Sequence, residues 1–346
     1  MNRTLRSSVC AIIVHHRGSG ILARCLESLL ASEGVALEIV VVANACQEAL
    51  PSLVEAHPRV HVIISERSVG FSAANNLGAR WARTHLPAHD YLFFVNNDTI
   101  AEPDALRRLI VVMAATPERV IAGPRLMIWG APRVLNSLGI NITLAGEAWD
   151  EGIGRPLEEF QPLPVCREVI AVTGAALMMR TTAYETLGGW EDLYGYYFED
   201  IDLCLRARSR GWEVVVVGDA VVHHAISATA VRGSDMKRQL SWRNRFLLMM
   251  IHWPAPLLLS AGSSTAAREL RLAGRRLRAR AWPDLRLQVR SWLGSIKRWP
   301  RAWSLRRALG GDQSWTGFLE AHGTVPVIRL PDLPDDALID SGDQSA

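Results

Sequence analysis

Residues 91–98 read YLFFVNND, and this stretch decides the fold. The apolar run from Tyr91 to Val95 predicts a buried strand, of the kind found in the middle of parallel sheets. The run stops at Asn96, Asn97 and Asp98, so polar side chains follow the strand directly. Ligands of open α/β sheets bind at the carboxyl ends of the strands, and we therefore expect a site at this point.

Strands and helices alternate around this stretch over the first 225 residues, which predicts βαβ units. Further strands are expected at residues 9–15, 37–43, 60–64, 169–179 and 214–217, and helices at 22–30, 70–81 and 199–210. Pro103 suits the first position of the helix after Asp98. The predicted fold class is α/β, with a Rossmann-like, mostly parallel sheet flanked by helices.

Composition excludes several classes of protein. Of 346 residues, 49% are hydrophobic and 21% are charged, so the chain is not largely disordered. Five scattered cysteines without C-x-x-C spacing argue against a disulfide scaffold and a cysteine zinc site, and they suit a reducing compartment. Residues 246–251, the most apolar run, are far fewer than the roughly 20 that span a membrane. With no signal peptide recognised, we expect a cytoplasmic protein.

The net charge of +3 hides a strongly basic segment. Residues 268–307 contain 13 Lys and Arg but only 2 acidic residues, and seven of the 12 tryptophans lie beyond residue 240. We therefore expect an α/β domain at 1–230, a helical, basic, Trp-rich extension at 231–310, and a loosely ordered acidic tail at 311–346.

The basic extension contains one apolar stripe at helical spacing, although Pro300 is expected to kink or break that helix. The stripe comprises Leu285, Val289, Trp292, Ile296, Trp299 and Trp303, flanked by Arg286, Arg290, Lys297 and Arg301. Such a helix suits the surface of an anionic membrane. It also suits packing on the α/β domain with a solvated basic flank. Nucleic acid is the weakest reading, because no nucleic-acid motif accompanies the charge, and we expect none to bind.

Two more polar clusters follow predicted strands. Glu199, Asp200 and Asp202 come after the aromatic loop 194–198, and His223-His224 end an apolar run. Turn formation, helix capping and packing would explain these residues and Asn96 to Asp98 without any function. Alternatively, Asp98 and an imidazole are suitable ligands for a divalent cation, with a diphosphate supplying further oxygens.

Taken together and in order, the segments resemble family 2 glycosyltransferases of the GT-A fold, specifically the bacterial rhamnosyltransferase-like branch. The resemblance runs from Val9 to Asn244 and is carried by VCAIIVHH, EIVVVANACQE, SVGFSAANNLGA, YLFFVNNDT, TGAALMMR, LGGWED, YFEDIDLCLRARSRGW, VVHH and a final Arg243-Asn244. The stretch from TGAALMMR to EDIDLCLRARSRGW is the most specific part.

The resemblance implies an inverting transfer of a sugar from a nucleotide diphosphate sugar to a hydroxyl of a glycan or lipid-linked glycan. It makes Asp200 the catalytic base, and it makes Asp98 and His223 ligands of Mg²⁺ or Mn²⁺, with the adjacent His224 as the alternative ligand. The residues implied on the donor side are Asn44, Gly70, Asn76, Asn97 and Asp98. The residues implied on the acceptor side are Gly189, Trp190 and Glu199. A lipid-linked acceptor would place the protein peripherally at the inner face of the cell membrane.

Two departures from the family pattern leave alternatives open. Ala43-Asn44 stands where the family usually has Asp-Asn, and Ser68 replaces an Asn before Gly70-Phe71. These changes put recognition of the nucleotide in doubt and permit a membrane-associated scaffold with a degenerate transferase domain. A nucleotidyltransferase is the other alternative, but its Gly-rich phosphate loop has only a faint match in residues 15–20.

Overall fold

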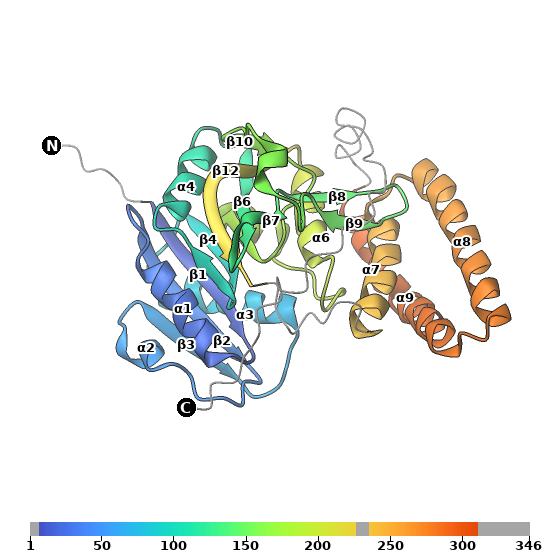
Figure 1. Cartoon of the computed structure of the whole chain (residues 1–346), viewed down its shortest axis with the longest axis horizontal. Helices are drawn as coiled ribbons and strands as arrows, with labels where there is room; N and C mark the ends of the chain where they lie inside the picture. Colours follow the sequence, from blue (N-terminus) through green and yellow to red (C-terminus); the bar gives the residue numbers. More distant parts are fainter. Residues whose placement is uncertain (1–6, 226–234, 311–346) are drawn as a thin grey trace.

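The computed structural model describes residues 7–225 and 235–310. The acidic tail expected at 311–346 lies outside the described residues. The described chain consists of a mixed sheet with helices on both faces, followed by long helices that stand at one side of it (Figure 1).

The amino-terminal part of the sheet is parallel, as the apolar runs predict. Its strands are β1 (Ser8–His15), β2 (Ala36–Asn44), β3 (Val60–Ser65) and β4 (Tyr91–Asn96). In register, Ile13 of β1 lies opposite Val41 of β2 on one side and Val95 of β4 on the other. The main path of the sheet runs β10-β12-β6-β11-β4-β1-β2-β3, so β4 and β1 are central and buried on both faces.

The second half of the sheet mixes directions. β11 (Ala176–Arg180) is antiparallel to both β4 and β6 (Arg119–Ile128), and β6 pairs in parallel with β12 (Glu213–His224). The α/β fold class is confirmed, but the strand expected at 169–179 is wrong in its first half. A turn precedes β11 instead, and it presents the N–H of Gly174 to a carboxylate oxygen of Asp200.

Residues 119–168 carry strands that the apolar pattern does not reveal. Besides β6 they form β7 (Ala131–Ser137), β8 (Ile140–Ile142), β9 (Ala148–Asp150), the 3-10 turn η1 (Leu157–Phe160) and β10 (Cys166–Glu168). β8 and β9 pair with each other and form a small separate sheet beside the main one (Figure 1). β5 (Thr99–Ala101) pairs with the end of β12 and thereby carries Asp98 to that strand.

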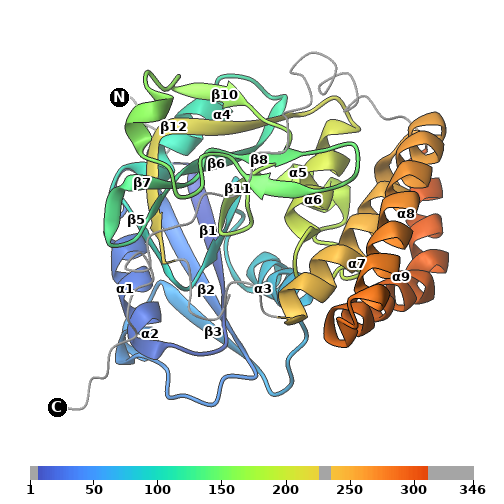
Figure 2. The same ribbon diagram turned by 45° about the vertical axis from the view of Figure 1, so that its right-hand side comes forward.

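Helices cover both faces of the sheet (Figure 2). One face packs on α1 (Ser19–Leu30), α2 (Ser52–Ala56) and α4 (Ala105–Ala114), and the other on α3 (Phe71–His85), α5 (Thr181–Leu187) and α6 (Glu199–Arg208). Alternation along β1 divides its side chains between the two cores. α3 lies so close to the sheet that a Cβ at Gly78 would sit 2.6 Å from Ile12. Pro103 lies in the turn before α4, not at its first position.

The basic extension is helical where described, with α7 (Asp235–His252), α8 (Ala255–Arg278) and α9 (Trp282–Ala308). α9 packs on α7 through small polar residues, since Ser291 and Ser295 donate to the carbonyls of Gln239 and Arg243 at 3.1 and 3.0 Å. The break expected at Pro300 is absent, because α9 continues through it. None of the described helices combines the length and apolar character needed to cross a bilayer.

Candidate active site

Asp98 and His224 meet at the carboxyl end of the sheet. Thr99 of β5 pairs with His224 of β12, and the N–H of Ala225 donates to the Asp98 carbonyl at 2.8 Å. The His224 Nε2 lies 3.3 Å from the Asp98 Oδ1, and the Asp98 residue is 8% exposed. His224 Nδ1 donates to Oδ1 of Asn136 at 2.8 Å, which turns Nε2 toward the carboxylate. Second partners of this kind usually orient a metal-binding imidazole.

His223 points to the opposite side of the sheet, because consecutive side chains of a strand alternate. Its Nε2 lies 3.4 Å from a carboxylate oxygen of Glu102, away from Asp98. Of the two histidines left open by the sequence, the structure therefore brings His224 and not His223 to Asp98. Asn97 binds inward instead, with Nδ2 3.0 Å from Nδ1 of His15 and 3.1 Å from the Arg17 carbonyl.

The Asp98–His224 pair suits a divalent cation that is shared with substrate. Burial lowers the pKa of His224, but Asp98 and Asp150 outweigh it and raise that pKa overall. Within residues 7–225 and 235–310, no group of three or more His, Cys, Asp or Glu is arranged to hold a metal alone. One carboxylate and one imidazole would thus need further oxygens, and a diphosphate offers them.

Asp200 begins α6 and is held by two backbone donors. Its Oδ2 accepts from the N–H of Gly174 and its Oδ1 from that of Ile201, both at 2.9 Å. Burial raises the pKa of Asp200 and outweighs these two hydrogen bonds, which lower it. Burial therefore opposes the start of the helix, which favours the ionised carboxylate.

Glu199 is the neighbouring acid and has a different environment. It is 7% exposed, and its Oε2 is buried without a hydrogen-bond partner in the described structure. Burial, together with the charge of Asp200, raises the pKa of Glu199 well above its usual range. Burial and the neighbouring Asp200 carboxylate thus both favour the neutral form of the Glu199 carboxyl.

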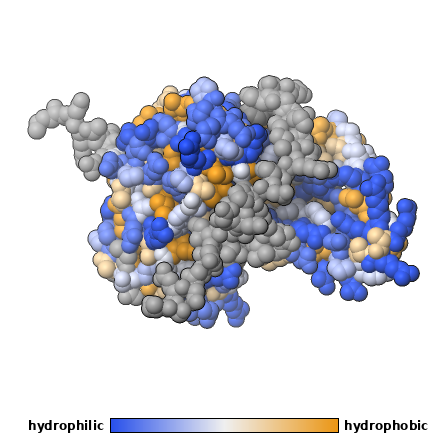
Figure 3. Space-filling view, viewed as in Figure 1, coloured by the Kyte–Doolittle hydropathy of each residue, from blue (hydrophilic) through white to orange (hydrophobic). Residues whose placement is uncertain are grey.

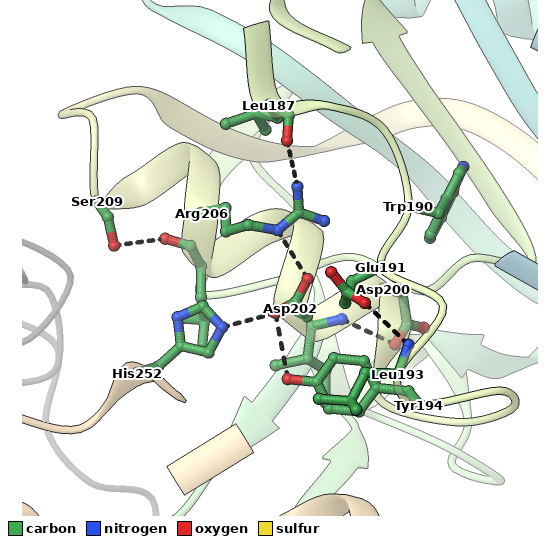
Figure 4. A network of polar contacts seen from close by, with 12 residues as sticks. Leu187, Trp190, Glu191, Leu193, Tyr194, Asp200, Asp202, Arg206, Ser209 and His252 are labelled. Carbon is green, nitrogen blue, oxygen red and sulfur yellow. Dashed lines mark hydrogen bonds and ion pairs between the residues drawn. The ribbon is translucent and has the colours of Figure 1, made fainter. Parts of the chain in front are cut away.

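Asp202 belongs to a buried network and not to an open site (Figure 4). Its carboxylate accepts from Arg206 Nε at 2.7 Å, from His252 Nε2 at 2.8 Å and from the Tyr194 hydroxyl at 3.2 Å. Burial raises the pKa of Asp202, but Arg206 and His252 outweigh it and bring the value to about 2. Asp202 therefore serves the packing of α6 against α7.

Two expected donor-side residues, Asn44 at the end of β2 and Gly70 before α3, shape the loop that leads into α3. Asn44 is 1% exposed, and its Oδ1 accepts from the N–H of Val69 at 2.9 Å, which fixes the loop before α3. Gly70 ends that loop with a φ of 86°, a left-handed conformation that favours glycine. The nearest atom to a Cβ at Gly70 would be the Gly195 carbonyl oxygen, so this loop adjoins the aromatic loop before Asp200.

Asn76, expected on the donor side, instead binds the Gly189-Trp190 turn. Its Nδ2 donates to the Trp190 carbonyl at 2.8 Å, and its Oδ1 accepts from the Trp190 N–H at 2.9 Å and the Tyr184 hydroxyl at 2.6 Å. A Cβ at Gly189 would approach that Oδ1 to 2.6 Å, so glycine is required there. Trp190, expected beside the acceptor, is 2% exposed and packs edge-on against Phe94 in the core.

Asp150 and Asn136 are site residues that the sequence does not reveal. Burial raises the pKa of Asp150 to about 6, with a further rise from Asp200 and opposing effects from Ser137, His224 and Lys237. Its Oδ1 is buried without a partner in the part of the chain described. Asp150 thus lies within electrostatic reach of both Asp200 and His224. No periodicity marks the short strand β9, so nothing in the sequence singles it out.

Comparison with known proteins identifies the family. The sequence profile described as "Glycosyltransferase like family 2" matches residues 8–245, which is most of the chain. The chain belongs to glycosyltransferase family 2. The resemblance seen in the sequence is confirmed, and the protein is a glycosyltransferase of the GT-A type, an enzyme that takes its sugar from a nucleotide-sugar donor.

Two relatives of this family 2 glycosyltransferase are named for different reactions. The chain is 26% identical over 254 residues to the low-salt glycan biosynthesis hexosyltransferase Agl10 of Haloferax volcanii, covering 71% of this chain and 77% of the relative. It is also 26% identical over 270 residues to the N-acetylglucosaminyl-diphospho-decaprenol L-rhamnosyltransferase of Mycobacterium tuberculosis, covering 70% and 87%.

Solved structures share the fold of the glycosyltransferase at low identity. GalNAc-T7, crystallised with UDP, GalNAc and Mn²⁺, matches with a TM-score of 0.59 and 14% identity, over 73% of this chain and 49% of that one. The mannosyltransferase PcManGT of Pyrobaculum calidifontis, in complex with GDP-Man and Mn²⁺, matches with a TM-score of 0.50 and 16% identity, over 85% and 88%.

Proposed function

We propose that the protein transfers a sugar, with inversion, from a nucleotide diphosphate sugar to a hydroxyl of a glycan or lipid-linked glycan. The observation that carries this proposal is the convergence of an Asp98–His224 pair and the Asp200 carboxylate at one edge of the sheet. Asp150 supports that convergence, because it interacts electrostatically with both Asp200 and His224. Carboxyl ends of strands are where α/β sheets bind ligands.

Asp98 and His224 would hold Mg²⁺ or Mn²⁺ together with the donor diphosphate. When bound, the cation neutralises the charge that develops on the departing diphosphate, which contributes several kcal/mol to catalysis. Mn²⁺ accompanies the nucleotide or nucleotide sugar in both fold relatives. The Asp98 carboxylate and the diphosphate oxygens are hard ligands that suit both Mg²⁺ and Mn²⁺.

Asp200 would act as the base. As the acceptor oxygen bonds to the anomeric carbon, the bond from that carbon to the diphosphate oxygen breaks, and the acceptor proton passes to Asp200. The orientation of the Asp200 carboxylate is fixed, because one oxygen accepts the N–H of Gly174 and the other accepts the N–H of Ile201. A single displacement of this kind inverts the anomeric centre.

The outer face of α9 supports docking on an anionic membrane, which would suit a lipid-linked acceptor. The apolar residues exposed along α9 are Val289, Leu293, Ile296, Trp299 and Trp303, from 38% to 52% exposed. The exposed basic residues beside them are Arg286, Arg290, Lys297 and Arg301. Figure 3 shows hydrophobic side chains interspersed with hydrophilic ones over the helical end of the molecule. Tryptophan and arginine on one helix face suit the lipid headgroup region.

The membrane and packing interpretations of this helix are compatible. α9 uses its buried small-residue face for α7 and leaves the tryptophan face exposed. The relative from Mycobacterium tuberculosis is named for a polyprenol-linked acceptor, which supports a membrane-bound substrate here as well.

The test is a transfer assay with UDP-, GDP- and dTDP-sugars, Mn²⁺ and a polyprenyl-diphosphate-linked saccharide. We expect release of the nucleoside diphosphate from one of these donors and its abolition by EDTA. Lack of release and of Mn²⁺-dependent binding for every donor would contradict the proposal and favour a scaffold with a degenerate domain.

A further inference from the structure

One side chain of α7 holds the loop that precedes Asp200. Asn244 is fully buried, and its Nδ2 donates to the carbonyl oxygens of Tyr194 at 3.1 Å, Tyr196 at 2.8 Å and Tyr197 at 2.7 Å. The two hydrogens of a single amide group are thus shared among three carbonyls of one short loop. Buried carbonyl groups without such a partner would destabilise this loop conformation.

Arg243 fixes the orientation of that amide. Its Nε donates to Asn244 Oδ1 at 2.8 Å, so the Asn244 oxygen faces the guanidinium and its nitrogen faces the loop. Arg243 Nη2 also donates to the Tyr194 carbonyl. Both residues lie in the middle of α7, which packs along α9.

The loop needs this support because its last two residues are strained. Tyr197 and Phe198 have φ angles of 68° and 77°, in the left-handed region that is unfavourable for a non-glycine residue. They come directly before Glu199 and Asp200. The loop conformation therefore determines where α6 begins and where the Asp200 carboxylate points.

The same helix also holds α6 on the far side of Asp200. His252, at the end of α7, donates to Asp202, which is itself held by Arg206 and Tyr194 (Figure 4). α7 therefore contacts the chain both before and after the proposed base. In the described structure, the loop carbonyls of Tyr194, Tyr196 and Tyr197 accept their side-chain hydrogen bonds from α7.

We propose that Asn244 is a positioning residue for glycosyl transfer, which acts through the aromatic loop 194–198 to align Asp200 with the acceptor. This inference rests on the proposed role of Asp200 as the base. Asn244 itself is buried between α7 and the loop, so its effect on turnover is indirect. Binding of the nucleotide and cation at Asp98 and His224 does not depend on it.

The experiment compares Asn244→Ala with Ser295→Ala. Ser295 is also buried and also bonds to α7, through the Arg243 carbonyl, but it does not touch the loop. We expect Asn244→Ala to lower kcat for transfer by about 10²-fold, as for a misplacement of roughly 1 Å. The affinity for Mn²⁺ with UDP or GDP, measured by calorimetry, should stay within about twofold of wild type, and Ser295→Ala should leave both quantities unchanged.

Hydrogen exchange distinguishes failure of this inference from failure of the proposed function. Backbone amides of residues 194–202 should exchange faster in Asn244→Ala than in wild type or Ser295→Ala, whatever reaction the enzyme performs. Asn244→Ser keeps one donor and should recover part of kcat and of the protection. Faster loop exchange with unchanged kcat, equal loss of kcat in Ser295→Ala, or unchanged exchange would each overturn the positioning role.

Discussion

His224 faces Asp98 across the ends of β12 and β5, with its Nε2 3.3 Å from the carboxylate, while the neighbouring His223 turns to Glu102. Sheet pairing and strand alternation together select one of two adjacent histidines. The selection gives the prediction about the cation a matched control on the same strand.

For the cation, we expect His224→Ala to weaken Mn²⁺-dependent binding of the nucleotide by at least about 10-fold, since one of the two proposed protein ligands is lost. His223→Ala should bind as wild type does, because its side chain points to the other side of the sheet. Calorimetry with and without Mn²⁺ measures both. A larger loss in His223→Ala than in His224→Ala would reverse the assignment.

For the base, we expect Asp200→Asn to lower turnover by about 10²–10⁴-fold, the usual effect of removing a positioned base. Glu199→Gln is the control, because burial favours the neutral form of the Glu199 carboxyl, and the neutral amide has nearly the same size and shape. It should retain most of the turnover near neutral pH. Steady-state rates that collapse in Glu199→Gln and survive in Asp200→Asn would show that Glu199 is the base.

For pH dependence, the sign follows from burial of Asp200. Burial raises its pKa above the ordinary 3.8, and the base must be ionised to accept a proton. Activity should therefore fall as the pH drops through a value above 3.8, while the protein is still folded. A profile of kcat/KM, with circular dichroism at each pH, measures this. An acidic limb at or below 3.8 would contradict it.

For stability, Asp202 should stabilise the fold at neutral pH and cease to do so in acid. Arg206 and His252 bring its pKa from 3.8 to about 2, against the effect of burial, so the contribution is present above 3.8 and lost as the pH falls through about 2. We expect the free energies of unfolding of wild type and Asp202→Asn to differ by about 2 kcal/mol more at pH 5 than at pH 2. Urea titrations at both pH values measure the difference. A constant difference would be inconsistent with this linkage.

For the membrane, Trp299→Ala with Trp303→Ala should weaken binding to phosphatidylglycerol vesicles, and Arg290→Glu with Lys297→Glu should weaken it and reduce its salt sensitivity. Arg210→Glu, a charge change on the sheet domain, is the control. Flotation with anionic and with purely zwitterionic vesicles measures both effects. Vesicle binding that none of these α9 variants alters would leave α9 as a packing helix only.

The sequence predicts the parts of this protein in which one physical signal dominates. Buried strands such as 37–43 and 91–95 are apolar apart from Glu38, so their place in a parallel sheet follows directly. Residues 131–168 lack such a signal, because their short strands are partly exposed and their pairing depends on the tertiary fold. For that reason the sequence does not single out Asp150.

The site residues divide in the same manner. Asp98 and Asp200 follow strongly patterned segments, and the structure places both at the carboxyl edge. Asn76 and Trp190 were expected at the donor and acceptor, whereas they bind each other in the interior. Asn76 lies on a helix, far from Gly189 and Trp190 in the sequence. Nothing in the sequence therefore indicates that its side chain binds their turn instead of a donor.

The attachment of α7 to the aromatic loop limits where the C-terminal helices can be exchanged between related proteins. The family profile ends at residue 245, just beyond Asn244. A gene fusion that exchanged the C-terminal part at residue 230 would separate Asn244 and His252 from the loop and helix that they hold. A junction after His252 would keep both contacts. An exchange of α8 and α9 that preserves both contacts therefore needs its junction downstream of α7.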